Sequence, residues 1–224
     1  MGTVTGRASR SLRAGLVIGL LAVFVTGCDL FKPATPEVGS GGSTLLPSYA
    51  TPESCLRYMQ IGIERKDNPG QAAYLGALAD TTKDGRGFHA FFDPAVWNAY
   101  NGVRPADWNL DYEAQFLSVF IRSYGDPYRM EWLEDADYPI ANEDKGEDSR
   151  ILHRRYKVWA LRKSTADTLL IGVGYAKLSF ARISAARWAL VLWEDRVDPV
   201  VGAQPAVDDQ RTFGYRRLNA GAGG

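Results

Sequence analysis

The spacing of apolar positions divides residues 48–218 into a helical first half and a strand-rich second half. Apolar residues three or four positions apart share one face of a helix, whereas every second residue shares one face of a strand. A helix start signal stands at Thr51, where a hydroxyl residue, a proline and an acid follow one another. Leu56, Met59 and Ile63 then recur at helical spacing, which predicts a first helix.

Two further helices are expected before the pattern changes. Residues 68–70 (Asn-Pro-Gly) end the first helix and cap a second one, which carries Leu75 and Leu78. A third helix is expected over residues 107–124. Its apolar stripe consists of Ala114, Leu117, Phe120, Ile121 and Tyr124. Between the second and third helices, residues 87–93 are a short aromatic run that fits a strand or an extended loop.

The second half is rich in aromatic and aliphatic residues with partial alternation, which is typical of strands. The expected strands cover residues 128–133, 151–162, 168–182, 187–195 and 212–218. Helices followed by consecutive long strands predict an α+β fold, with N-terminal helices packed on a curved antiparallel sheet. Gly172, Gly174 and Ala176 share one side of a central strand, where small residues suit a curved sheet or a helix lying close to it.

The amino terminus has a pattern of its own. Residues 1–13 contain Arg7, Arg10 and Arg13 and no acid, and residues 14–25 are an apolar run of 12 residues. A helix needs about 20 residues to span a hydrocarbon core. The run therefore fits the apolar region of a secretory signal peptide better than a membrane span.

The apolar run closes on Val25-Thr26-Gly27-Cys28, which resembles the lipobox of bacterial lipoproteins. The resemblance implies that the signal, residues 1–27, is cleaved between Gly27 and Cys28, and that Cys28 is acylated on its sulfur and its amine. Each buried methylene contributes about 0.8 kcal/mol, so two or more acyl chains hold a protein on a membrane where one binds only marginally. We expect a lipid-anchored protein of a bacterial cell envelope, with its domain facing the periplasm or the exterior.

Behind the cysteine, the composition predicts a tether, one domain and a tail. Residues 28–47 comprise Cys28 and a flexible Pro-, Gly- and Ser-containing linker, with a reach on the order of 25 Å. Residues 48–218 suit a single hydrophobic core, and residues 219–224 are a Gly- and Ala-rich tail that we expect to be frayed.

Charge and cysteine content narrow the range of partners. The whole chain has 26 basic and 26 acidic residues, and loss of the three signal arginines leaves a mature domain with a net charge of −3. Such a domain lacks the surplus of Lys and Arg that nucleic-acid binding requires, and it has no electrostatic reason to lie flat on an anionic membrane. With Cys28 acylated, Cys55 has no disulfide partner within the chain, and its place beside the apolar stripe of the first helix predicts a structural thiol.

The strand-rich end resembles a known family. Residues 188–195 (Trp-Ala-Leu-Val-Leu-Trp-Glu-Asp) and 212–218 (Thr-Phe-Gly-Tyr-Arg-Arg-Leu) resemble the closing strands of uncharacterised bacterial lipoproteins with a nuclear transport factor 2-like domain (NTF2-like, SnoaL-like). In those relatives Trp usually stands at the position of Phe213. Residues 51–56 resemble their first helix. The resemblance implies a cystatin-like cone, and its motifs concern packing more than chemistry.

The sequence predicts no metal and no cofactor. His89 and His153 lie 64 positions apart, so neither a paired-His motif nor a Cys/His zinc spacing exists. Eight acids in residues 131–148 invite a calcium site, but their spacing departs from an EF-hand loop, and an acidic hairpin loop facing a basic strand is the simpler interpretation. The six tryptophans are expected mainly in the core.

Acid–base chemistry of the ketosteroid isomerase type needs a carboxylate base and a donor such as Tyr inside an apolar cone. The candidate bases are Asp93, Glu194 and Asp195. The candidate donors are Tyr112, Tyr128, Tyr156 and Tyr175. No spacing selects one pair among them, so the sequence names no catalytic residue.

We therefore expect a non-catalytic domain that binds or assembles, pairing through its sheet with a second copy or with an envelope protein. The alternative is a small cofactor-independent enzyme or a carrier of an apolar ligand. A cone filled by Trp and Phe favours the first hypothesis, whereas a hollow with a buried carboxylate near a Tyr favours the second.

Overall fold

The computed structural model describes residues 47–98, 107–133, 141–164, 167–198 and 212–220, which all belong to one compact unit, residues 44–224. The expected signal peptide, Gly27, Cys28 and nearly all of the linker lie outside the described residues. Within the described part of the chain, no helix has the length and apolar character needed to cross a membrane.

The helices of the first half begin where hydroxyl and acidic side chains cap them. The Thr51 hydroxyl accepts a hydrogen bond from Ser54 N–H at 3.1 Å, and the Ser54 hydroxyl accepts one from Thr51 N–H at 3.0 Å, as in a capping box. Asp67, rather than Asn68, caps the second helix through Gly70 N–H at 2.7 Å. The helices are α2 (Pro52–Arg65), α3 (Asn68–Gly76), α4 (Thr81–Asp84), α5 (Pro94–Asn98), α6 (Leu110–Ser123) and α7 (Phe213–Ala220).

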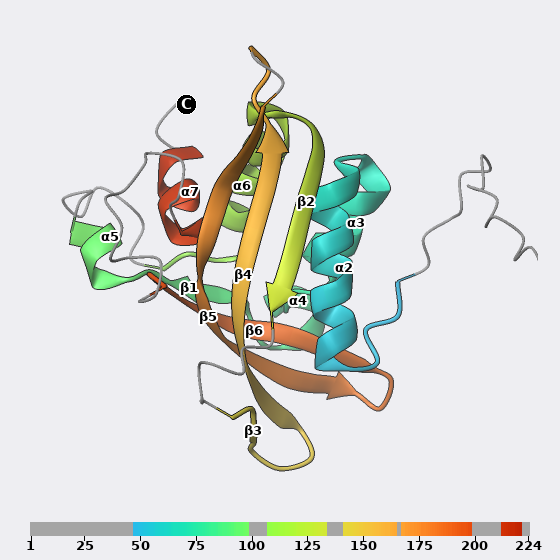
Figure 1. The fold of residues 1–224 in the computed structure, drawn as a ribbon. Helices are drawn as coiled ribbons and strands as arrows, with labels where there is room; N and C mark the ends of the chain where they lie inside the picture. The colour runs from blue at the N-terminus through green and yellow to red at the C-terminus, as the bar shows by residue number, and fades with distance from the viewer. Residues whose placement is uncertain (1–46, 99–106, 134–140, 165–166, 199–211, 221–224) are drawn as a thin grey trace, which may run out of the picture. The chain divides into compact units, whose positions relative to one another are not determined.

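The strands form one curved, open sheet in the order β1-β6-β5-β4-β2, with β3 pairing with β4 (Figure 1). The strands are β1 (His89–Phe91), β2 (Gly125–Leu133), β3 (Glu143–Asp144), β4 (Ser149–Leu161), β5 (Thr168–Ser184) and β6 (Arg187–Arg196). The pairings of β2 through β6 are antiparallel, as predicted. The short aromatic run at residues 87–93 contributes β1, which runs parallel to β6.

Helices pack on one face of this sheet. Helix α2 packs against β2 and β6, and α6 packs against α7, which in turn lies on β5 and β6 (Figure 1). Alternation along β4 separates the two faces, because Leu152, Tyr156 and Val158 are buried while His153 and Lys157 between them are only partly buried. The predicted arrangement of helices on a curved sheet is confirmed.

The glycines of β5 make room for what packs on the inner face. A Cβ atom on Gly174 would overlap the Tyr156 hydroxyl oxygen, and one on Gly172 would lie 3.4 Å from the Phe213 ring of α7. The overlap excludes any side chain at Gly174 unless Tyr156 moves. The small residues were predicted to suit a curved sheet or a helix close to it, and both occur: Gly172 faces Phe213 of α7, and Gly174 leaves room for Tyr156 of the neighbouring strand.

The prediction of a strand at residues 212–218 is wrong, because this segment forms α7. The Thr212 hydroxyl accepts a hydrogen bond from Tyr215 N–H at 3.2 Å, and Arg216 N–H bonds to Thr212 C=O at 3.1 Å. A strand would place Tyr215 on the same face as Phe213 and Arg217, but only the latter two are fully buried. The four-residue period of burial is that of a helix, and the helix continues through residues 219 and 220, which the sequence assigned to a frayed tail.

Candidate functional site

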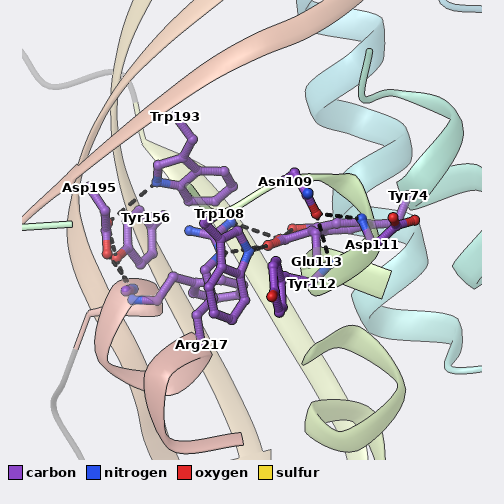
Figure 2. A network of polar contacts seen from close by, with 12 residues as sticks. Tyr74, Trp108, Asn109, Asp111, Tyr112, Glu113, Tyr156, Trp193, Asp195 and Arg217 are labelled. Carbon is purple, nitrogen blue, oxygen red and sulfur yellow. Dashed lines mark hydrogen bonds and ion pairs between the residues drawn. The ribbon is translucent and has the colours of Figure 1, made fainter. Parts of the chain in front are cut away.

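The fold brings one predicted base together with one predicted donor, at the start of α7. Tyr156 on β4 donates a hydrogen bond to Asp195 Oδ1 on β6 at 2.7 Å (Figure 2). Gly214 N–H donates to Asp195 Oδ2, Phe213 N–H donates to the Tyr156 hydroxyl at 2.7 Å, and Trp193 Nε1 lies 3.4 Å from Oδ1. The first backbone N–H groups of a helix lack partners within it, so this pair caps α7.

The pair is deeply buried, and burial dominates its titration. Asp195 is 2% exposed and Tyr156 is fully buried. Desolvation raises the pKa of Asp195, although the nearby Arg217 charge and the hydrogen bonds donated by Tyr156 and Gly214 act in the opposite direction. Desolvation and the neighbouring carboxylate also hold the pKa of Tyr156 well above its ordinary value. A carboxyl of raised pKa beside a phenol has the composition of an acid–base pair, but its polar atoms are directed at α7.

A second buried cluster holds the other end of α7 against α6. Arg217 forms a bidentate ion pair with Glu113, from Nε to Oε2 at 2.7 Å and from Nη2 to Oε1 at 2.8 Å (Figure 2). Tyr74 of α3 donates to Oε1 at 2.6 Å, and Trp108 Nε1 donates to Oε2 at 2.8 Å. The Glu113 carboxylate thus accepts four hydrogen bonds from three separate parts of the chain. Arg217 and Glu113 are both fully buried.

The Glu113 carboxylate keeps its two neighbours, Arg217 and Tyr74, protonated. Burial by itself lowers the pKa of the Arg217 guanidinium, but the Glu113 charge and its hydrogen bonds hold that pKa above its ordinary value. Desolvation, followed by the charge of Glu113, raises the pKa of Tyr74 well above 10. The hydroxyl of Tyr74 therefore stays protonated and remains a donor to the carboxylate.

Aromatic rings fill the space between the two clusters. Phe213 stacks on Trp193 with ring centroids 5.6 Å apart, and it meets Tyr156 and Phe116 edge to face at 5.4 and 5.7 Å. The Arg217 guanidinium lies 4.2 Å from the centre of the Trp193 ring. Aromatic rings therefore pack this part of the interior.

The other two predicted bases serve local structure. Asp93 accepts hydrogen bonds from Ala95 N–H at 2.8 Å, just inside α5, and from Val197 N–H at 3.3 Å. Glu194 forms an ion pair with Lys177 at 3.2 Å across β5 and β6. Neither carboxylate is brought to a predicted tyrosine donor by any contact seen in the described residues.

The remaining predicted donors are dispersed. Tyr112 is 38% exposed on α6, and Tyr128 donates to Phe120 C=O at 2.7 Å next to the helix end. Tyr175 lies on the opposite face of the sheet from α7, where its hydroxyl contacts His153 Nδ1. The structure therefore selects Tyr156 and sets the other three apart from Asp195.

The histidines and Cys55 have structural partners. His89 Nδ1 lies 2.5 Å from Asp107, and both side chains are substantially exposed. His153 Nε2 lies 3.4 Å from Glu143 of β3. Cys55 is fully buried with its sulfur 3.3 Å from Trp188 C=O, and burial raises the pKa of its thiol to about 12. No cluster of three or more His, Cys, Asp or Glu side chains suited to a metal occurs among the residues the structure describes.

Sequence reasoning missed Glu113 and Arg217. Glu113 lies three and four positions before Phe116 and Leu117, so it falls on the buried stripe of α6. An acid on an apolar stripe is a usable signal for a buried ion pair. Arg217 could not be recognised while residues 212–218 were assigned to a strand, because its partner is decided by the docking of α7.

No protein-family model and no curated protein matches the chain. A protein of unknown function from Mycobacterium tuberculosis is similar in structure, with a TM-score of 0.50 and 12% identity over 75% of this chain and 82% of that one. A nuclear transport factor 2-like superfamily protein from Salmonella enterica serovar Typhimurium has a TM-score of 0.43 and 13% identity, over 67% and 92% of the two chains. A protein with a cystatin-like fold from Nostoc punctiforme has a TM-score of 0.42 and 14% identity, over 66% and 88%. Identities this low concern the fold alone. The fold of this chain is α+β, with helices on one face of a curved, open sheet.

Proposed function

We propose that this chain is a lipid-anchored cell-envelope protein whose NTF2-like domain binds or assembles and does not catalyse. One observation carries the non-catalytic part of the proposal. The Asp195–Tyr156 pair, which has the chemistry of a general acid and base, is directed at the first backbone N–H groups of α7. A catalytic base must reach a substrate proton, and these side chains are almost completely buried against the protein's own helix.

The anchor rests on the lipobox at Gly27 and Cys28. Metabolic labelling with a fatty acid tests it in the full-length chain. The wild-type protein is expected to take up label and to be shortened by its signal, whereas Cys28→Ser is expected to do neither. Cys55→Ser is the matched control, because it removes the other cysteine and should leave labelling unchanged. A labelled Cys28→Ser protein would contradict the anchor.

The outer face of the sheet is the proposed contact surface. It carries half-buried Trp159 on β4, with the Arg129 guanidinium of β2 5.8 Å from the centre of its ring. An aromatic ring beside a guanidinium suits pairing with a second copy or with an envelope protein, because aromatic residues and Arg are enriched at protein interfaces. Sedimentation of the wild type is expected to show self-association that Trp159→Lys abolishes. Val119→Lys, at an apolar residue 44% exposed on α6, is the matched control. A strictly monomeric wild type that captures no envelope partner would refute this part.

The alternative function is a small cofactor-independent enzyme or a carrier of an apolar ligand. It is favoured by a buried carboxyl of raised pKa within 2.7 Å of a tyrosine hydroxyl. This alternative requires α7 to leave the pair. A hydrophobic dye that fluoresces in apolar hollows would then bind the native protein, whereas the proposed function predicts no such binding.

A further inference from the structure

The Glu113 carboxylate is oriented by groups that do not belong to α7. Tyr74 donates to Oε1 and Trp108 donates to Oε2, at 2.6 and 2.8 Å, and both residues lie outside α7. Glu113 itself sits on α6, whose neighbouring buried residues fix its backbone. Two of the four hydrogen bonds to the carboxylate therefore do not depend on α7, and such prior orientation is what gives a site affinity.

The surroundings of Glu113 match the shape of a guanidinium group. A carboxylate with both oxygens in one plane accepts the two parallel N–H groups of a guanidinium edge, which an ammonium cannot supply. The Trp193 ring lies 4.2 Å from the guanidinium carbon, so an aromatic face covers the planar cation. Edge recognition by Glu113 and face recognition by Trp193 come from two different elements, α6 and β6.

Arg217 fits this pocket by one edge only. Its Nε and Nη2 bond to Glu113, but its Nη1 is buried and has no hydrogen-bond partner. Among the residues the structure describes, Arg217 Nη1 is the one buried side-chain nitrogen or oxygen without a hydrogen-bond partner. An unpaired buried donor weakens the attachment of α7, which has only eight residues and cannot hold helical structure without its contacts.

Withdrawal of Arg217 would leave Glu113 as a buried and uncompensated negative charge, which is strongly unfavourable. We infer that Glu113, Tyr74, Trp108 and Trp193 form a binding site for a guanidinium group, and that Arg217 of α7 is its resident occupant. The ligand class is a guanidinium cation on an aliphatic chain, as in an arginine side chain. The inference goes beyond the proposed contact surface, because this site lies on the helix-covered face of the sheet and not on its outer face.

The test uses the full-length Arg217→Ala protein and n-propylguanidinium at millimolar concentrations, far below those that denature proteins. The expected result is a saturable rise in the melting temperature, about 3–6 °C at ten times the dissociation constant. n-Butylammonium has the same charge but lacks the two parallel N–H groups of a guanidinium, so it should not raise the melting temperature. The wild type should not respond, because Arg217 fills the site. Glu113→Gln/Arg217→Ala should not respond, because the two parallel N–H groups of the guanidinium no longer meet a carboxylate.

Equal responses to both cations, or no response, would overturn the inference. If Arg217→Ala does not fold alone, refolding from urea decides the question, because n-propylguanidinium and not n-butylammonium should restore the near-ultraviolet circular dichroism. Recovery with neither cation would equally refute the site. Both failures are distinguishable from failure of the proposed function, which fatty-acid labelling and sedimentation measure on chains with an intact Arg217.

Discussion

Replacing Glu113 by Gln tests the energetic weight of the buried network directly. The carboxylate accepts two bonds on each oxygen, and each oxygen bonds one nitrogen of Arg217 and one aromatic donor. A carboxamide has only one accepting oxygen, so either orientation of the introduced amide turns its N–H₂ toward one arginine nitrogen and one aromatic donor. The Arg217 charge is also left buried without a counter-charge. Breaking a buried pair in this way costs about 3–5 kcal/mol.

That cost is a large share of the roughly 5–15 kcal/mol by which domains are stable. Urea denaturation followed by tryptophan fluorescence should show the loss as a lower midpoint with an unchanged slope. Arg217→Met should cost a similar amount, because it leaves Glu113 unpaired. The double variant Glu113→Gln/Arg217→Met should cost less than the sum of the two single changes, because it leaves no buried charge unpaired, although one of the Tyr74 and Trp108 donors still lacks an acceptor.

An exposed ion pair serves as the control. Lys83 and Asp80 are 3.0 Å apart, with the Lys83 side chain 78% exposed, so Lys83→Met should change stability by less than about 0.5 kcal/mol. The reasoning is refuted if Glu113→Gln costs less than about 1 kcal/mol, or if the double variant costs the sum of the two single changes.

Three other predictions follow from the same interior. Burial raises the pKa of Asp195, so its ionised form is disfavoured in the folded chain. The stability of the wild type relative to Asp195→Asn should therefore be greatest near pH 4 and fall as the pH rises through the raised pKa. Urea midpoints of both proteins from about pH 4 to 8 check this, and a difference in stability that does not change with pH contradicts it. Gly174→Ala should destabilise the fold by about 1–3 kcal/mol, because the added Cβ overlaps the Tyr156 hydroxyl. Gly172→Ala, whose Cβ has its nearest contact at 3.4 Å, should destabilise it less, and thermal melts of the two variants compare the losses. Cys55, whose thiol pKa is raised to about 12, should react with iodoacetamide only after denaturation, and labelling of the native chain at the rate of a free thiol would show the thiol to be accessible.

Local patterns predicted most of the fold because local physics decides those elements. The start of α2 needs only Thr51, Pro52 and Ser54, which cap the helix within one turn. The long strands β4 and β5 were predictable because alternation follows from which face is buried. The prediction for residues 212–218 was wrong, because the aromatic and basic residues of this segment fit a short strand and a short helix equally well by composition.

The site shows the same division. Asp195 and Tyr156 were both among the candidates, but their sequence separation of 39 residues gave no reason to pair them. Their pairing depends on the register that places β4 and β6 on either side of β5. Glu113 and Arg217 lie 104 residues apart, and their ion pair exists only because α7 docks against α6.

The sequence by itself determined the class of fold, the start of α2, the small residues of β5 and the expectation of a lipid anchor at Cys28. These features depend on neighbours within a few positions, where spacing and side-chain chemistry suffice. Only the tertiary structure decided that α7 is a helix, that Asp195 and Tyr156 cap it, and that Glu113 binds Arg217. A buried polar group is stable only with partners from other elements, so its role is set by packing that no single segment contains.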